Sequence, residues 1–165
     1  MEQDLPRTDR RALLVLLALS GCGFVPAFGS GGAAQGLMGA VRTADPKDQR
    51  DHAFVGRIED RFGRPGVALF ELGYGIMTRS EAVAITGEGA ITRFNLVGTV
   101  DWTLDRRSDG LRLAGGSEGS FTSYSATGST VAGLTAKMDA ERRLMVILAD
   151  QVVARVIATS GGFGG

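Results

Sequence analysis

The stretch TRFNLVGTVDWTL, residues 92–104, decides the fold class of this chain of 165 residues. Its apolar residues alternate with polar ones, which is the pattern of a β-strand that is buried on one face and solvated on the other. The apolar positions are Phe94, Leu96, Val100, Trp102 and Leu104. Such a strand needs paired neighbours and a covering layer, so the sequence predicts a sheet with one buried face.

Further strands are predicted on both sides of this stretch. A period of two also runs through residues 67–85, and residues 86–89 have the glycine-rich composition of a turn. Residues 106–110 are expected to form a hairpin loop, and residues 111–125 a partner strand that glycines interrupt. These strands are predicted to form an antiparallel meander. A fourth strand is predicted at residues 37–43 from its bounds, a Gly-rich stretch before it and a proline after it.

Two amphipathic helices complete the predicted domain. In residues 48–62 the apolar side chains recur at helical spacing, and residues 63–66 end the pattern. In residues 131–159 they recur at spacings of three, four and seven, after a serine and a threonine that can cap a helix. The apolar positions of this second helix are Leu134, Met138, Met145, Leu148, Val152 and Val156. The predicted fold class is α+β, a two-layer sandwich with two helices on one face of a four-stranded, mostly antiparallel sheet, in the order β-α-β-β-β-α.

The N-terminal residues have the pattern of an export signal. Charged residues precede an unbroken apolar run, residues 12–19, which is too short for a transmembrane helix and has the length of the apolar region of a signal peptide. The run ends in Leu19-Ser20-Gly21-Cys22, which resembles the lipobox of bacterial lipoproteins. Residues 1–21 are therefore predicted to be a lipoprotein signal peptide.

Cys22 is the only cysteine of the chain, and its thiol is the predicted lipid attachment site. Several acyl chains would anchor the protein stably, whereas a single chain would not. Residue 23 is glycine rather than aspartate, so the resemblance to bacterial lipoproteins implies sorting to the outer membrane. The alternative is an ordinary free thiol behind an ordinary signal peptide.

The chain is predicted to hold one folded domain. Residues 22–36 comprise the lipidated cysteine and a flexible tether rich in Gly, Ser and Ala. Residues 37–160 form the α+β domain, and residues 161–165 a disordered tail.

The charge balance and the ligand inventory exclude several classes of function. The 18 lysines and arginines balance 18 aspartates and glutamates, so the chain has no basic field for nucleic acid. One cysteine and one histidine do not supply the three or four ligands of a Cys/His metal site. No metal and no cofactor is therefore expected.

Three stretches behind the lipobox give the chain a family resemblance. They are TRFNLVGTVDWTL (92–104), GSFTSYSATGSTVA (119–132) and DAERRLMVILADQVVARV (139–156). They resemble the third strand, the last strand and the C-terminal helix of the LptE family of LPS-assembly lipoproteins.

The LptE resemblance implies a non-catalytic lipoprotein of the cell outer membrane. Such a protein is lipid-anchored on the periplasmic side and sits within the lumen of a large β-barrel translocon, LptD. It plugs that barrel and helps to assemble it. It also binds lipopolysaccharide and assists its transport to the outer leaflet.

A lipopolysaccharide-binding site should present arginines or lysines, because their charged hydrogen bonds to the phosphates of lipid A are strong. The candidates are Arg106 and Arg107 in the predicted hairpin loop, Arg112 just after it, and Arg93 on the polar face of the 92–104 strand. For each of them the alternative interpretation is an exposed basic residue that serves solubility.

Two other functions compete with this interpretation. Residues 115–119 match the G-x-S-x-G elbow of esterases, with Ser117 as the nucleophile. The base would have to be His52, the only histidine, which precedes the serine, so an enzyme is not expected. The main alternative is a periplasm-facing lipoprotein that binds a small ligand or acts as an envelope scaffold.

Three aromatic residues and the histidine have structural interpretations beside functional ones. Trp102, Phe94 and Tyr124 could stack on a glycan, but residues on alternating strands more often belong to the core or to cross-strand pairs. His52 lies on the polar side of its predicted helix, where an exposed, neutral imidazole is expected.

Overall fold

The computed structural model describes residues 29, 32, 34–85, 87, 89 and 91–163. The predicted signal peptide and Cys22 lie outside the described residues. The elements, in chain order, are the 3-10 helix η1 (Gln35–Leu37), β1 (Val41–Thr43), α2 (Gln49–Phe62), β2 (Phe70–Ile85), β3 (Ile91–Arg106), β4 (Arg112–Ser125), α3 (Thr130–Thr159) and the 3-10 helix η2 (Ser160–Gly162).

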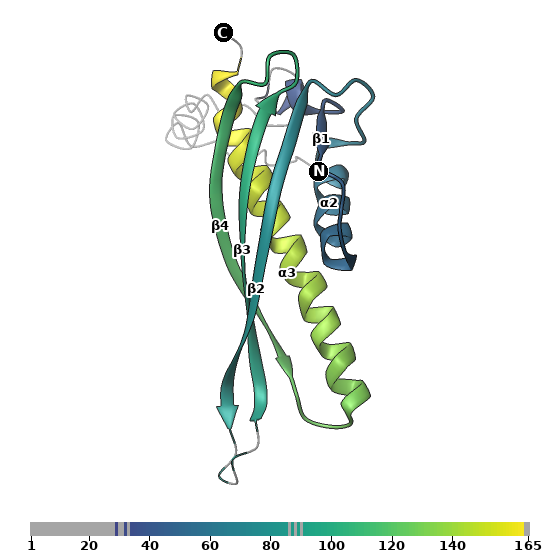
Figure 1. Ribbon diagram of the computed structural model, residues 1–165, viewed down its shortest axis with the longest axis vertical. Coiled ribbons are helices and arrows are strands. Elements are labelled where there is room, and N and C mark those ends of the chain that lie inside the picture. The colour runs from purple at the N-terminus through teal and green to yellow at the C-terminus, as the bar shows by residue number, and fades with distance from the viewer. Residues whose placement is uncertain are drawn as a thin grey trace, which may run out of the picture.

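The four strands form one sheet in the order β1-β2-β3-β4. β1 runs parallel to β2, whereas the β2–β3 and β3–β4 pairs are antiparallel. Both helices lie on the same side of the sheet, and no described helix covers the other side (Figure 1). The predicted fold class, with two helices on one face of a mostly antiparallel sheet, is confirmed.

β1 is shorter than the strand predicted at residues 37–43 and begins only at Val41. Leu37 instead ends η1, with its side chain buried. Gly39 has a φ of 65°, a left-handed conformation that turns the chain and interrupts extended structure. The prediction is therefore wrong for residues 37–40, because the bounding residues do not reveal a turn inside the segment.

Alternate residues of the strands and one face of each helix form the core. The buried apolar side chains of β2 and β3 are Leu72, Leu96, Val100, Trp102 and Leu104, and those of the helices are Phe54, Val55, Ile58, Phe62, Ala140, Leu144, Met145, Leu148, Ala149, Val152, Val153 and Val156. The alternation predicted in residues 92–104 and the helical period predicted in residues 48–62 are both confirmed.

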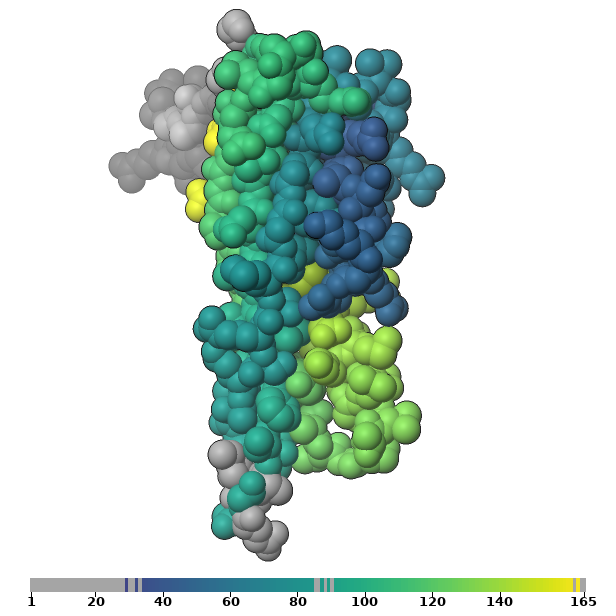
Figure 2. All heavy atoms as spheres, in the orientation of Figure 1, coloured from purple at the N-terminus to yellow at the C-terminus, as the bar shows by residue number. Residues whose placement is uncertain are grey.

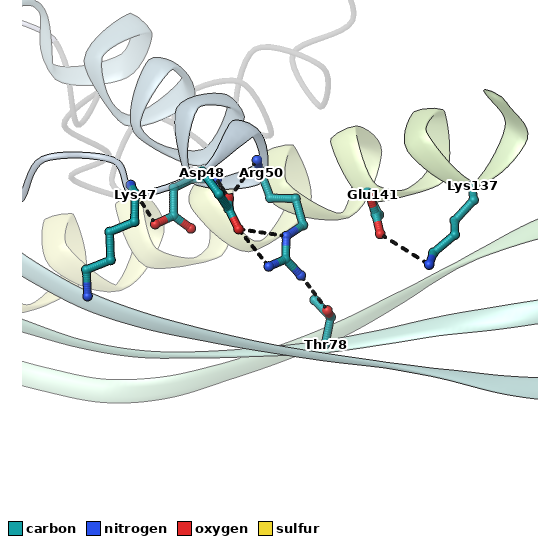
Figure 3. A network of polar contacts seen from close by, with 7 residues as sticks. Lys47, Asp48, Arg50, Thr78, Lys137 and Glu141 are labelled. Atoms are coloured by element: carbon teal, nitrogen blue, oxygen red, sulfur yellow. Dashed lines mark hydrogen bonds and ion pairs between the residues drawn. The ribbon is translucent and has the colours of Figure 1, made fainter. Parts of the chain in front are cut away.

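Local features of the chain define both ends of α2. The carboxylate of Asp48 caps its start by accepting from the backbone N–H groups of Arg50 and Asp51, both at 2.9 Å. Gly63, with a φ of 78°, ends it. The Arg50 guanidinium also donates to Thr78 Oγ1 of β2 at 3.0 Å, which ties the start of the helix to the sheet (Figure 3).

The apolar stripe predicted for α3 is buried only from Ala140 onward. Leu134 and Met138 belong to this stripe but are 60% and 46% exposed. The first turns of α3 extend past the start of α2, so α2 does not cover them (Figure 1). A helical period identifies a stripe but does not show where the covering element ends.

α3 lies against β3 at Gly98. A Cβ at this position would lie 2.8 Å from Leu144 Cδ2 and 3.3 Å from Leu148 Cδ1. Both leucines are fully buried, so neither can move away without opening the core. Gly98 therefore sets the distance between the helix layer and the sheet.

We expect Gly98→Ala to lower the free energy of unfolding by about 1–3 kcal/mol, because overpacking a filled core has a cost of this size. Gly75→Ala is the matched control, since a Cβ at Gly75 of β2 meets nothing within 4 Å. This control should be neutral or slightly stabilising, because alanine restricts the unfolded chain. Urea unfolding measures both variants, and equal stabilities would contradict the role given to Gly98.

Asp150 of α3 joins the two helices through two arginines of α2. Arg57 donates from Nε and Nη2 at 3.0 and 2.9 Å, and Arg61 donates from Nε at 2.9 Å. Partial burial raises the pKa of the Asp150 carboxyl, but the hydrogen bonds from Arg57 and Arg61 and their positive charges together outweigh this effect, so the net pKa lies below its ordinary value.

Because the folded-state pKa of Asp150 is lowered, its stabilising effect is complete above the unfolded-state pKa of about 4 and is lost as the pH falls through the folded-state pKa. We expect Asp150→Asn to lower the free energy of unfolding by about 1 kcal/mol near neutral pH, since this cluster is partly exposed and partly screened. The difference from wild type should shrink in acid. Unfolding curves at several pH values test this, and a difference that does not vary with pH would contradict it.

Candidate functional site

The structure places the four arginine candidates at two ends of the sheet. Arg106 and Arg107 lie at the end of β3 and in the turn that follows, and Arg112 begins β4. Arg93 lies near the start of β3. Because a strand rises about 3.3 Å per residue, Arg93 is roughly 40 Å from Arg106. The four candidates therefore do not form one site.

Each candidate arginine near the β3–β4 turn has a carboxylate partner. The pairs are Arg106–Asp109 at 3.3 Å, Arg107–Glu71 at 3.4 Å and Arg112–Asp105 at 2.8 Å. The hydrogen bond from Arg112 lowers the pKa of Asp105, and the same bond raises the pKa of Arg112. An anion that binds at these arginines must compete with carboxylates already in place.

An open hollow of about 520 Å³ lies beside Arg106 and Arg107. The Arg107 N–H donates to the Leu69 carbonyl at 2.9 Å, which brings the segment before β2 next to the β3–β4 turn. Phe163, a residue of the predicted C-terminal tail, places its ring centroid 6.2 Å from that of Phe70. The hollow therefore combines apolar walls with two guanidinium groups.

Arg93 has no carboxylate partner among the described residues. It borders a hollow of about 570 Å³ at the far end of the sheet. The polar residues around this hollow are Thr92, Asn95, Ser123, Ser125 and Thr127. A guanidinium among hydroxyl and amide groups can bind a phosphate without displacing a carboxylate.

A larger cleft of about 650 Å³ lies between the start of α2 and the first half of α3. Figure 3 shows Arg50 reaching from α2 to β2, and Lys137 paired with Glu141 on α3 at 4.0 Å. The cleft is lined by Gln49, Arg50, His52, Ala53, Thr135, Met138, Asp139, Glu141 and Arg142. Its arginines, Arg50 and Arg142, are balanced by Asp139 and Glu141, so the cleft has no strong field of either sign.

Ser117 and His52 lie in different layers of the molecule. Ser117 is an exposed residue of β4, opposite Asp101 of β3. Its neighbour Glu118 pairs with Arg155 of α3, so Ser117 points to the side of the sheet without helices. His52 belongs to α2, in the helix layer. The G-x-S-x-G motif is therefore part of a regular strand and not a nucleophile elbow.

The three aromatic candidates have structural roles. Trp102 is 3% exposed, and a Cβ at Gly116 of β4 would lie 3.4 Å from its Nε1 atom. Phe94 and Tyr124 are opposite each other on β3 and β4, and their rings stack with centroids 5.3 Å apart. Core packing and cross-strand pairing account for their positions.

The side of β2, β3 and β4 that faces away from the helices is called the open face below. Figure 2 views the molecule from this side, with the strands in front of α3. Much of the open face carries small or short side chains, at Gly73, Gly75, Thr99, Thr103, Gly115, Ser117 and Gly119. Such residues leave the backbone of the sheet accessible to a flat partner surface.

An apolar stripe crosses the open face and consists of Met77, Val97 and Phe121. Val97 is directly opposite Phe121, and Met77 is opposite Thr99, one pair further along the sheet. Met77 and Phe121 are 67% and 61% exposed. Sequence reasoning missed this stripe, because its members come from three strands and only the register brings them together.

Two further features bear on the chemistry of the described residues. None of their helices combines the length and the apolar character that crossing a membrane requires. Nor do these residues include three or more His, Cys, Asp or Glu side chains grouped so as to hold a metal ion.

Several solved structures have the same fold. A crystal structure of a putative lipoprotein from Caulobacter crescentus matches with a TM-score of 0.67 and 18% identity, over 81% of this chain and 99% of that chain. The rare lipoprotein B from Shewanella oneidensis matches with a TM-score of 0.59 and 10% identity, over 76% and 98%. A lipoprotein B from Nitrosomonas europaea matches with a TM-score of 0.56 and 13% identity, over 74% and 84%.

The family assignment comes from the sequence. No curated protein sequence gives a significant match. The family model of LptE, described as lipopolysaccharide-assembly, matches residues 39–156, which is more than half of the chain. The matched segment runs from the turn before β1 to the last buried residue of α3. The resemblance of the strand and helix motifs is thus confirmed, and the chain belongs to the LptE family of non-enzymatic, lipopolysaccharide-assembly lipoproteins.

Proposed function

We propose that this chain is an outer-membrane lipoprotein, acylated at Cys22, that plugs an LptD-type β-barrel and helps to assemble it. In this role it binds lipopolysaccharide and assists its transport to the outer leaflet. The family assignment supports the process. The open face of the sheet is the observation that supports the partner.

The open face has the size and composition that a barrel plug needs. β2 and β3 each span 16 residues, which at about 3.3 Å per residue gives a length near 50 Å. This is comparable with the 40–45 Å, roughly, of a bilayer with its headgroups. The small side chains of the open face allow close approach to the strands of a barrel wall. The charges of the chain are balanced, so it brings no excess of one sign into a polar lumen.

The four candidate arginines are proposed to contact the phosphates of lipopolysaccharide. The two ends of the sheet differ in whether a carboxylate must first be displaced. Arg93 can donate hydrogen bonds to a phosphate directly, because no described carboxylate is paired with its guanidinium. Arg106, Arg107 and Arg112 must first give up an aspartate or a glutamate. We therefore rank Arg93 first among the four.

A second candidate function rests on the cleft between α2 and α3. Its volume of about 650 Å³ would admit a small ligand, as the alternative of a periplasm-facing binding or scaffold module requires. A module of this kind would be recovered from the membrane without a barrel.

Affinity purification of the lipoprotein from the outer membrane of its native host tests the plug. We expect one large β-barrel to copurify with the wild-type chain and its recovery to fall roughly tenfold or more in Phe121→Glu, because a buried, unpaired charge weakens an interface by that much. Leu134→Glu is the control, since Leu134 is 60% exposed on α3. Recovery of the wild-type protein without any barrel would instead support the alternative module.

Mass spectrometry of the isolated lipoprotein tests the anchor separately. The mature chain should begin at Cys22 and carry acyl groups, and Cys22→Ala should retain residues 1–21 because it has no thiol to modify. Ser20→Ala, which keeps a small residue in the lipobox, should be processed normally. An unmodified cysteine or an intact leader in the wild-type protein would refute acylation.

A further inference from the structure

Three segments that are distant in sequence meet at one end of the domain. The Gly66 N–H donates to the Gly39 carbonyl at 3.1 Å, which joins the turn before β1 to the segment after α2. The Arg107 N–H donates to Leu69, which joins that segment to the β3–β4 turn. Figure 1 shows these turns at the same end of the molecule as the C-terminal end of α3. We call this the turn end.

Exposed apolar side chains gather at the turn end. They are Met38, Val67, Leu69 and Leu111, which are 48%, 76%, 53% and 53% exposed. We call these four residues the end patch. They come from all three joined segments, so the patch exists only in the folded domain. Large, accessible apolar groups that the described core does not use mark a contact surface.

The chain enters the domain beside the end patch. Ala34 and Leu37 are buried, and the Ala40 N–H donates to Leu37 at 3.1 Å just before β1. Cys22 precedes Ala34 by only a dozen residues, and a segment of that length spans at most about 40 Å. An acyl anchor at Cys22 therefore keeps Ala34, and the turn end beside it, within about 40 Å of the bilayer.

The charges around the end patch suit a zwitterionic surface. Its guanidinium groups are matched by carboxylates, in the pairs Arg64–Glu59, Arg106–Asp109, Arg107–Glu71 and Arg112–Asp105. Phosphatidylethanolamine headgroups also carry one charge of each sign, so they can exchange partners with these pairs without a net repulsion. A strongly basic patch would instead have indicated an anionic surface.

We propose that the end patch is a lipid-contact surface, which rests in the headgroup region of the leaflet that holds the acyl anchor. The proposal rests on acylation of Cys22 and adds an orientation to the proposed function. The turn end lies at the leaflet that holds the anchor, and the far end of the sheet, with the β2–β3 hairpin and the start of α3, points along the proposed barrel lumen toward the opposite leaflet. The four apolar side chains insert among the headgroups, while the surrounding ion pairs meet the phosphates and amines.

Fluorescent labels on the acylated, full-length protein test this orientation. Acylation occupies Cys22, so Val67→Cys and Val131→Cys each introduce one free thiol for an environment-sensitive dye. The two valines are matched in type and exposure, at 76% and 74%, but lie at opposite ends of the domain. In vesicles of phosphatidylethanolamine with a minor fraction of phosphatidylglycerol, a lipid-borne quencher should quench the label at position 67 several-fold more than the label at 131.

A charge variant tests whether the apolar side chains themselves make the contact. Leu111→Glu should reduce quenching of the label at position 67 several-fold, because the new carboxylate resists transfer from water into the headgroup region. Leu134→Glu, at the far end, should leave the quenching unchanged. Both leucines are exposed, at 53% and 60%, so neither change should disturb folding, which circular dichroism verifies.

The possible outcomes separate this proposal from the proposed function. If Cys22 is not acylated, the protein does not stay with the vesicles, so the anchor and the lipid-contact surface that rests on it both fail, whereas the plug is tested separately by copurification. If the protein stays bound but the labels at 67 and 131 are quenched equally, or neither is quenched, the lipid-contact surface is refuted and acylation stands. Quenching at 67 that disappears when the barrel is present would assign the end patch to the barrel, which also refutes it.

Discussion

The close contact between α3 and β3 at Gly98 is the constraint on which the architecture depends. Without a side chain at this position, Leu144 and Leu148 lie directly on the strand and are fully buried. α2 then packs against α3, and Asp150 holds the two helices together through Arg57 and Arg61. Both helices are thereby committed to one side of the sheet, and the open face is left without a covering layer.

That uncovered side has a physical consequence for function. An antiparallel sheet tolerates one solvated face, but here an apolar stripe of Met77, Val97 and Phe121 interrupts the small and polar residues. A methionine and a phenylalanine that are more than half exposed add nothing to the described core. Their exposure is best explained by a partner surface, and the barrel wall that we propose as the partner is, like this face, built of strands.

The sequence predicts the helices and strands well, but it does not predict where they end or which of their residues contact each other. The alternation in residues 92–104 identifies the strand that pairs with neighbours on both sides, because the polarity of each residue in a half-buried strand indicates which face of the sheet it occupies. The turn at Gly39 and the exposed position of Leu134 were missed, because periodicity does not show where a neighbouring element begins or ends. The candidate arginines were identified as basic residues, but the carboxylate partner of Arg107, Glu71, comes from another strand, and only the fold reveals that pairing.

The two ends of the sheet differ in a way that fits a directional role. At the turn end, arginines are neutralised by carboxylates and apolar side chains are exposed, so this end suits an interface with zwitterionic headgroups. At the far end, Arg93 has no described carboxylate partner and lies among hydroxyl and amide groups. If the acyl anchor holds the turn end at the inner leaflet, the strand places Arg93 roughly 40 Å further along, close to the thickness of a bilayer with its headgroups. The Arg93 guanidinium would then lie toward the outer leaflet, to which we propose that lipopolysaccharide is delivered, so this spacing would link the proposed anchor to the proposed transport.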